Sequence, residues 1–97
     1  MTDYKGKILL VDDDPGLLKL LSIRLKTEGY DIAAVESGMK ALATATNFRP
    51  DLIITDLKMD QMNGIELLQE VQQRWPGLRV LLMTAHGTIP DAVKATQ

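Results

Sequence analysis

The chain has 97 residues, enough for one small domain, and 45% of them are hydrophobic, so it can bury a core. Its formal net charge of −2 argues against binding of nucleic acid or an anionic membrane by this segment alone. The absence of cysteine excludes disulfides and thiolate metal sites. No apolar run is long enough to span a bilayer and the first residues do not form an apolar leader, so we expect a cytoplasmic protein.

Four short runs rich in isoleucine, leucine and valine predict β-strands. They occupy residues 8–12, 31–35, 51–55 and 79–83. The first, third and fourth runs are continuously apolar, which is typical of strands that are covered on both faces. The second run is weaker and indicates a strand at the edge of a sheet.

Helical patterns alternate with these strands. The first covers residues 15–28 and ends at Gly29, a favoured residue just past a helix C-terminus. Its leucines recur at spacings of three and four, which indicates one apolar face: Leu17, Leu18, Leu21 and Leu25. The second helix is expected to begin after Ser37, a good N-cap, and to run to about residue 47.

The third helical pattern covers residues 64–75 and is ended by Pro76-Gly77. Its apolar face comprises Ile65, Leu68, Val71 and Trp75. A fourth helix is expected to begin after Thr88, which can serve as its cap. The alternation of strands and helices predicts one domain over residues 1–97, an open parallel sheet with right-handed crossovers and helices on both faces.

Three consecutive aspartates, Asp12, Asp13 and Asp14, follow the first predicted strand. Asp14 precedes Pro15, and an aspartate followed by proline is typical of a helix N-cap with proline at the first helical position. Asp12 and Asp13 remain, and Asp56 ends the third strand. In parallel α/β sheets the ligand site lies beyond the carboxyl ends of the strands, so these three carboxylates converge if the first and third strands are neighbours.

Carboxylates without cysteine or clustered histidine favour a hard cation such as Mg²⁺, which commonly uses one or two carboxylates and retains water ligands. A carboxylate beside such a cation can also attack phosphorus and become an aspartyl phosphate. A hydroxyl such as that of Thr84, just past the fourth strand, can donate a hydrogen bond to phosphoryl oxygens.

Three segments, ILLVDDDPGLLKLL, LIITDLKMDQMNG and VLLMTAHG, resemble in order and spacing the receiver domain of two-component response regulators. The segments DDDPGLLKLL and TAHGTIPDAVKATQ are further similar to receivers of NtrC-type, sigma-54-dependent transcriptional regulators, in particular the GlrR-like branch. The resemblance covers the whole chain. It implies a flavodoxin-like (CheY-like) doubly wound sheet with strand order 2-1-3-4, and a fifth strand and fifth helix that residues 1–97 do not include.

The resemblance also implies roles for individual residues. Asp56 would be the phosphoacceptor, phosphorylated by a sensor histidine kinase, and would share Mg²⁺ with Asp12, Asp13 and the backbone carbonyl of Lys58. Asp12 would contact the metal through water. The protein would thus be a signalling switch that catalyses only its own phosphotransfer and dephosphorylation, and not a metabolic enzyme.

The resemblance implies that two residues just after the fourth predicted strand complete the switch. Thr84 would be the hydroxyl that moves toward the phosphoryl group, and Ala85 the small residue that leaves it room. The output domains, an AAA+ ATPase and a helix-turn-helix, are implied only for a longer regulator. We also consider that the side chain of Lys58 overhangs the site and limits the access of water to the phosphoryl group.

The chain departs from the family pattern at three points. Asp60 stands where receivers usually have proline, and Asn63 precedes Gly64 where aspartate is commoner. The lysine that receivers carry on the fifth strand has no counterpart in residues 1–97, which suggests a truncated receiver with impaired phosphorylation. Its fourth strand would then be an exposed apolar edge, so we expect self-association there.

Two alternatives remain open from the sequence. A haloacid-dehalogenase-like phosphatase would use Asp12 and Asp14 as a D-x-D pair, although Gly16 stands where that family prefers threonine or valine. A pseudo-receiver would only mediate protein contacts. Met59 and Met62, in the loop after Asp56, are interpreted as packing or surface residues.

Overall fold

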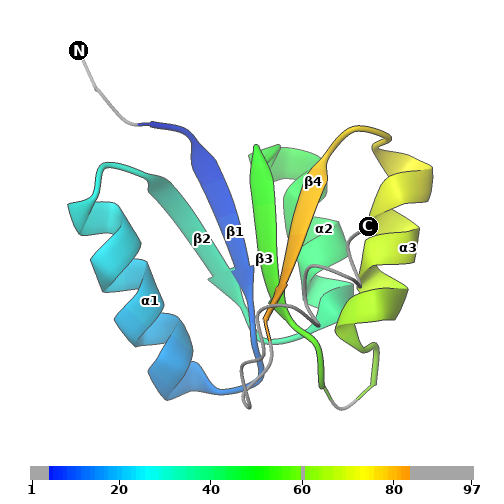
Figure 1. Ribbon diagram of the computed structural model, residues 1–97, viewed down its shortest axis with the longest axis horizontal. Coiled ribbons are helices and arrows are strands. Elements are labelled where there is room, and N and C mark those ends of the chain that lie inside the picture. Colours follow the sequence, from blue (N-terminus) through cyan, green and yellow to red (C-terminus); the bar gives the residue numbers. More distant parts are fainter. Residues whose placement is uncertain (1–4, 60, 84–97) are drawn as a thin grey trace.

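The computed structural model describes residues 5–59 and 61–83 (Figure 1). The elements in chain order are β1 (Lys7–Val11), α1 (Pro15–Thr27), β2 (Asp31–Val35), α2 (Gly38–Phe48), β3 (Leu52–Asp56), α3 (Gly64–Arg74) and β4 (Arg79–Met83). The predicted strands and the first three predicted helices are confirmed to within one residue at each end. The helix expected after Thr88 lies outside the described residues. No helix in the described ranges is long and apolar enough to cross a membrane.

The strands form one parallel sheet of order β2-β1-β3-β4, which confirms the expected topology. As predicted, β2 lies at an edge. In the register between β1 and β3, Leu9 pairs with Ile53 and Val11 with Thr55. The carboxyl ends of these two strands therefore lie side by side, and the residues that follow them share one edge of the sheet.

Alternate residues of β1 enter two different cores. Leu9 and Val11 belong to the larger cluster, which is formed with α2 and α3, whereas Ile8 and Leu10 pack with Leu18 of α1. Figure 1 shows α1 on one face of the sheet and α2 and α3 on the other. Because both faces of β1 are covered, its sequence is continuously apolar, as the sequence predicted.

The sequence also predicted that β4 is covered on both faces, and in the described part of the chain this prediction is wrong. Val80 and Leu82 are buried, but Arg79 is exposed and Leu81 is 43% exposed. The reason is that α1 packs mainly over β1 and β2, so within residues 5–59 and 61–83 the α1 side of β4 lies open.

The leucines of α1 are also less uniformly buried than their spacing predicts. Leu18 is buried and Leu21 and Leu25 are half-buried, whereas Leu17 is 38% exposed. At the C-terminus the helix ends as expected at Gly29, whose φ is +102°. The amides of Gly29 and Tyr30 donate to the carbonyls of the last turn, which satisfies backbone groups that the helix leaves free.

Both other helices have side-chain caps. The hydroxyl of Ser37 accepts a hydrogen bond from the amide of Lys40 at 3.1 Å, which confirms Ser37 as the cap of α2. In α3, Leu67, Leu68 and Val71 form the buried face, whereas Ile65 and Trp75 are half-buried, so the sequence missed Leu67. The buried face of α3 is thus turned toward Leu67, which belongs to the core that α3 shares with α2 on the same side of the sheet.

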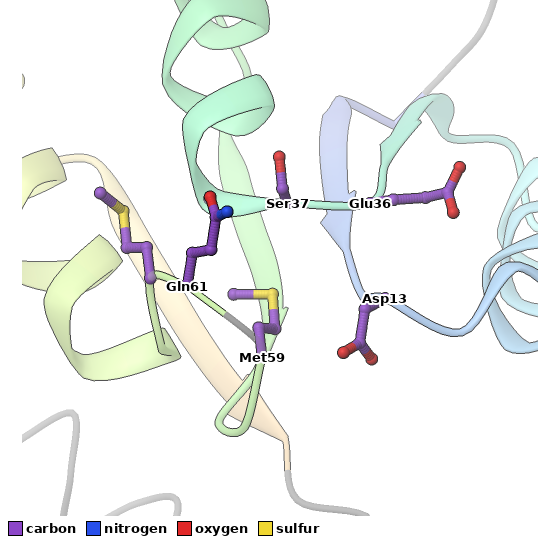
Figure 2. A pocket seen from close by; sticks show the side chains of 7 residues that line it. Asp13, Glu36, Ser37, Met59 and Gln61 are labelled. Atoms are coloured by element: carbon purple, nitrogen blue, oxygen red, sulfur yellow. The ribbon is translucent and has the colours of Figure 1, made fainter.

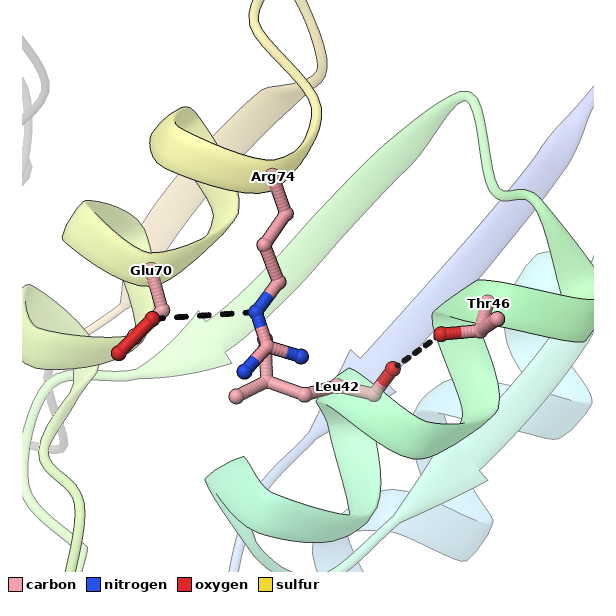
Figure 3. A network of polar contacts seen from close by, with 4 residues as sticks. All are labelled: Leu42, Thr46, Glu70 and Arg74. Carbon is pink, nitrogen blue, oxygen red and sulfur yellow. Dashed lines mark hydrogen bonds and ion pairs between the residues drawn. The ribbon is translucent and has the colours of Figure 1, made fainter.

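Figure 3 shows polar contacts within these two helices. Arg74 lies 3.8 Å from Glu70 one turn earlier in α3, and the Thr46 hydroxyl donates to the carbonyl of Leu42 at 3.1 Å in α2. The Arg74 and Glu70 side chains are about half exposed, so their ion pair contributes only a few tenths of a kcal/mol.

Candidate metal centre

Asp12 is a buried carboxylate, with only 4% of its surface exposed. Its amide donates to the carbonyl of Val35 at 3.2 Å, so its backbone continues the pairing of β1 with β2. Its Oδ1 accepts a hydrogen bond from the amide of Asp14 at 2.9 Å. The backbone and the side chain of Asp12 are thus both fixed at the end of the strand.

Asp13 and Asp56 lie beside Asp12, because the carboxyl ends of β1 and β3 are adjacent. One carboxylate oxygen from each of the three residues lies within 4.8 Å of the other two. Asp12 is buried, Asp56 is half-buried and Asp13 is exposed. The convergence expected from the strand ends is therefore present, and it forms a cluster that opens toward solvent on the Asp13 side.

Asp14 is separate from this cluster and caps α1, as the sequence predicted. Its Oδ1 accepts hydrogen bonds from the amides of Gly16 at 3.0 Å and Leu17 at 3.2 Å. The carboxylate is thereby committed to two of the amides that the first helical turn leaves without partners. This commitment counts against a D-x-D phosphatase, which would need Asp14 as an acid or base.

The cluster concentrates negative charge. Burial raises the pKa of Asp12, and the nearby charges of Asp56, Asp13 and Asp14 raise it further, while the hydrogen bond from the Asp14 amide opposes the rise. The ion pair between Glu70 and Arg74 is the only one within residues 5–59 and 61–83, so no basic side chain of that part neutralises the cluster.

The donor set fits a hard divalent cation. Three carboxylates supply only oxygen, the ligand that Mg²⁺ and Ca²⁺ prefer, and none is paired with a cation within the described residues. Partial exposure on the Asp13 side leaves room for water ligands, which Mg²⁺ retains more strongly than Ca²⁺ does. The residues of this chain are therefore suited to holding Mg²⁺.

A pocket of about 310 Å³ opens over the cluster. It is lined by Asp12, Asp13, Asp14, Leu17, Leu21, Asp56 and Met83. Leu17 thus borders the acidic pocket instead of the core, which explains its exposure. The wall that α1 provides is apolar, and it lowers the local dielectric on one side of the carboxylates.

The loop that follows Asp56 is held at both ends. The amide of Leu57 donates to Met83 at 2.7 Å, and its carbonyl accepts from Gly64 at 2.9 Å. The amide of Lys58 donates to Oδ1 of Asp56 at 3.4 Å, a long hydrogen bond, while the Lys58 side chain is exposed. This segment, residues 57–63, is called the acceptor loop below.

A second pocket of about 250 Å³ lies between the acceptor loop and the start of α2 (Figure 2). It is lined by Asp13, Glu36, Ser37, Gly38, Met59, Gln61 and Met62. Figure 2 shows Asp13 and Met59 on different walls of this pocket, one at the end of β1 and the other in the loop after β3. Met59 and Met62 both pack against the larger core, in agreement with their interpretation as packing residues.

The structure gives structural roles to three residues of this region to which the sequence analysis assigned none. Asn63 caps α3, since its Oδ1 accepts from the Glu66 amide at 2.8 Å and Glu66 accepts from the Asn63 amide at 3.0 Å. The motif N-x-x-E before an apolar helix is the signal that could have revealed this capping box. Gly38 and Gly64, the first residues of α2 and α3, are the other two, because neither has room for a side chain. Thr84, Ala85 and Asp60 lie outside the described residues.

The sheet order and the acidic cluster at the carboxyl edge together define a flavodoxin-like α/β domain with three clustered carboxylates at the ends of β1 and β3. A family model of the response regulator receiver domain matches residues 8–97. The chain therefore belongs to the response regulator receiver family.

Individual relatives agree with this assignment. The chain is 52% identical over 97 residues to the transcriptional regulatory protein GlrR of Escherichia coli, covering 100% of this chain and 22% of that protein. It is 36% identical over 93 residues to the DNA-binding transcriptional regulator NtrC of Salmonella typhimurium, covering 96% of this chain and 20% of that protein. The chain thus spans about a fifth of the length of these curated relatives. Among solved structures, the chemotaxis response regulator CheY4 of Vibrio cholerae superimposes with a TM-score of 0.81 at 30% identity, covering 93% of this chain and 76% of that one.

Proposed function

We propose that this receiver domain is a phosphoacceptor in two-component signalling, in which a sensor histidine kinase phosphorylates Asp56 in a Mg²⁺-dependent reaction. The observation that carries the proposal is the convergence of the Asp12, Asp13 and Asp56 carboxylates within 4.8 Å. Half-buried Asp56 is the nucleophile, because it ends β3 just before the acceptor loop and lines the pocket. Asp12 and Asp13 hold the metal, together with the backbone carbonyl of Lys58.

The transfer needs one bond to form and one to break. A carboxylate oxygen of Asp56 attacks phosphorus while the bond from phosphorus to the donor nitrogen or oxygen breaks, which yields an aspartyl phosphate. Bound Mg²⁺ supplies positive charge that offsets the charge of the phosphoryl oxygens. Asp12 and Asp13 fix the position of that charge, and the apolar wall of Leu17 and Leu21 restricts water on one side of the pocket.

Likeness to the family supports two further roles in the switch. Thr84 donates a hydrogen bond to the phosphoryl group and Ala85 leaves space for that group. Phosphorylation then shifts a two-state equilibrium of the domain, and an output region reads the shift. Because GlrR and NtrC are named as transcriptional regulators, we propose that this output is transcriptional, with the AAA+ and helix-turn-helix domains of sigma-54-dependent regulators.

We also propose that residues 1–97 on their own form a stable aspartyl phosphate poorly, because receivers use a fifth-strand lysine to contact the phosphoryl group. Two polypeptides test both proposals: residues 1–97, and the same residues extended with the segment of the E. coli GlrR receiver that contains this lysine. Each is treated with acetyl phosphate and Mg²⁺, and separately with beryllofluoride, with Asp56→Ala as the control.

We expect Mg²⁺-dependent modification of the extended polypeptide that is lost in Asp56→Ala, and little stable modification of residues 1–97. Failure of the extended form would contradict the phosphoacceptor function. Efficient modification of residues 1–97 would instead show that the lysine matters less than proposed. A pseudo-receiver, the remaining alternative, predicts no modification of either polypeptide.

We propose in addition that residues 1–97 self-associate through the edge of β4. Within the described residues β4 pairs only with β3, and Leu81 on its open face is 43% exposed. An unpaired strand edge with apolar side chains is a template for pairing with another chain. Light scattering tests this directly: we expect association that increases with concentration and is reduced in Leu81→Lys, and a monodisperse monomer at high concentration would contradict it.

A further inference from the structure

The start of α2 and the acceptor loop meet at Gly38 and Met62. A Cβ atom on Gly38 would lie 2.7 Å from Sδ of Met62 and 3.0 Å from its Cβ and Cγ. Real Cβ atoms essentially never approach another atom as closely as 2.7 Å. A contact of 3.0 Å is tighter than nine in ten of those that real Cβ atoms make. Two of the three atoms are near the backbone of Met62, so rotation of the thioether end alone would not relieve the overlap.

The backbone at position 38 does not itself require glycine. Gly38 is the first residue of α2 and is not one of the described glycines with positive φ, which are Gly6, Gly29 and Gly77. In a helix alanine is more favourable than glycine by about 0.5–1 kcal/mol. The reason for glycine at this position is therefore the close approach of Met62.

Met62 ties the acceptor loop to the larger core. Its side chain is half-buried and packs against that core, and it lies next to Asn63, the cap of α3. Gly64 holds the far end of the loop on the backbone of Asp56, while the contact with Gly38 holds the loop on the β2–α2 connection. Both contacts border the pockets that contain Asp13, one of the three clustered aspartates.

We propose that Gly38 is a positioning residue for the Mg²⁺ site, acting through Met62. This inference rests on the proposed function, because the acceptor loop directly follows Asp56 and carries the Lys58 carbonyl to which the metal is assigned. Because Gly38 has no side chain, Met62 can pack against it, and the acceptor loop can lie close to Asp13. Ligands from the end of β1 and from the loop can then reach one cation. A side chain at position 38 displaces Met62 and with it the loop.

A double-mutant cycle on the 97-residue chain tests the proposal, with the dissociation constant for Mg²⁺ as the readout. Calorimetric or NMR titration measures this constant without any phosphorylation. Substitution of residues that support metal ligands typically weakens metal binding by about 10–100-fold. We therefore expect Gly38→Ala to weaken Mg²⁺ binding by about tenfold, at the lower end of this range. We expect Met62→Ala to weaken it by about threefold, since the loop loses its anchor but gains no overlap.

The combination decides whether the two residues act together. In Gly38→Ala/Met62→Ala the Sδ and Cγ atoms that oppose the new methyl group are gone, and only the Cβ of residue 62, at 3.0 Å, remains. We therefore expect a combined loss of between about threefold and tenfold. Independent effects would multiply to about thirtyfold, and that result would overturn the proposal. The matched control is Gly16→Ala, because a Cβ there would meet only Oδ1 of Asp14, at an ordinary 3.4 Å; its Mg²⁺ affinity should equal that of the wild type.

Further outcomes separate this proposal from the proposed function. If the wild type and Asp13→Asn bind Mg²⁺ equally, the metal centre itself is wrongly assigned, and the proposal falls with it. If Asp13→Asn loses binding but Gly38→Ala does not, the metal centre stands and the positioning role is overturned. Urea unfolding of each variant establishes that it is folded. Should Gly38→Ala fail to fold, Met62→Ala decides the matter, since unchanged affinity in that variant would also overturn the role.

Discussion

A Cβ atom on Gly64 would lie 2.6 Å from the backbone oxygen of Asp56, so the first turn of α3 rests directly on the proposed phosphoacceptor. The same atom would lie 2.9 Å from Cδ2 of Leu82 in β4. The start of α3, the backbone of Asp56 and the side chain of Leu82 in β4 therefore meet at a point that has no space for a methyl group. Asn63, which stands just before Gly64 where receivers more often have aspartate, leaves the contact between Gly64 and Asp56 intact.

We expect Gly64→Ala to lower the free energy of unfolding by about 1–3 kcal/mol, the usual cost of inserting atoms into a packed region. Alanine is the better helix former, so propensity alone predicts the opposite sign. Urea denaturation measures the difference, with Gly16→Ala as the matched control in the first turn of α1. A Gly64→Ala protein as stable as the wild type would mean that the backbone of Asp56 moves freely away from α3.

Asn63 and Glu66 form a reciprocal cap that should be worth about 1 kcal/mol. We expect Asn63→Ala to lose about this amount in urea unfolding, because the Glu66 amide then lacks its side-chain acceptor. Asn63→Asp should stay close to the wild type, since a carboxylate oxygen also accepts this hydrogen bond. An equal loss in both variants would indicate that the amide group of Asn63 has another role.

The periodicity of the sequence predicts most of this fold, and the reasons can be traced to individual residues. The continuous apolar run of β1 arises because Leu9 and Leu10 enter different cores, one on each face of the sheet. Asp14 is recognisable as a cap because its neighbour is Pro15. Asp56 is recognisable as a partner of the first-strand aspartates once strands 1 and 3 are taken as neighbours.

Other features depend on tertiary distances that no pattern encodes. Leu17 fits the apolar stripe of α1 but borders the acidic pocket, because it lies in the first turn of the helix, next to the carboxyl end of β1 where the aspartates cluster. Leu81 belongs to a continuous apolar run, yet its face lies open within the described residues. The requirement for glycine at position 38 depends on where Met62, far away in sequence, comes to lie.

Metal-free protein should become less stable as pH rises because of Asp12. Burial, followed by the charges of Asp56, Asp13 and Asp14, raises the pKa of Asp12 above its ordinary value of 3.8, so the folded protein holds this proton more tightly than the unfolded chain does. The stability that this proton contributes is complete below pH 3.8 and is lost as pH rises through the pKa of the folded state.

In EDTA at neutral pH we therefore expect Asp12→Asn to have a higher Tm than the wild type. Asparagine keeps an oxygen that can accept from the Asp14 amide and removes the buried charge. The difference should shrink as the pH falls to 3.8 and below, and Mg²⁺ should raise the Tm of the wild type more than that of the variant. The control is Asp31→Asn, because Asp31 is a half-buried aspartate at the start of β2, at the opposite end of the sheet from the cluster. It should not show this pattern, and a lower Tm for Asp12→Asn at neutral pH would contradict the assignment.

Lys58 provides a test of how water reaches the phosphoryl group. Its amide is tied to Asp56 and its side chain is exposed, so the side chain can lie over the mouth of the pocket. If it shields the aspartyl phosphate, Lys58→Ala should shorten the half-life of that intermediate by a few-fold, because hydrolysis requires an unobstructed water. The half-life is measured in the polypeptide extended through the fifth strand, after removal of the phosphodonor. Lys26→Ala, an exposed lysine near the C-terminus of α1, is the control for a general effect of charge; equal half-lives in all three proteins would show that water approaches Asp56 by a route that Lys58 does not cover.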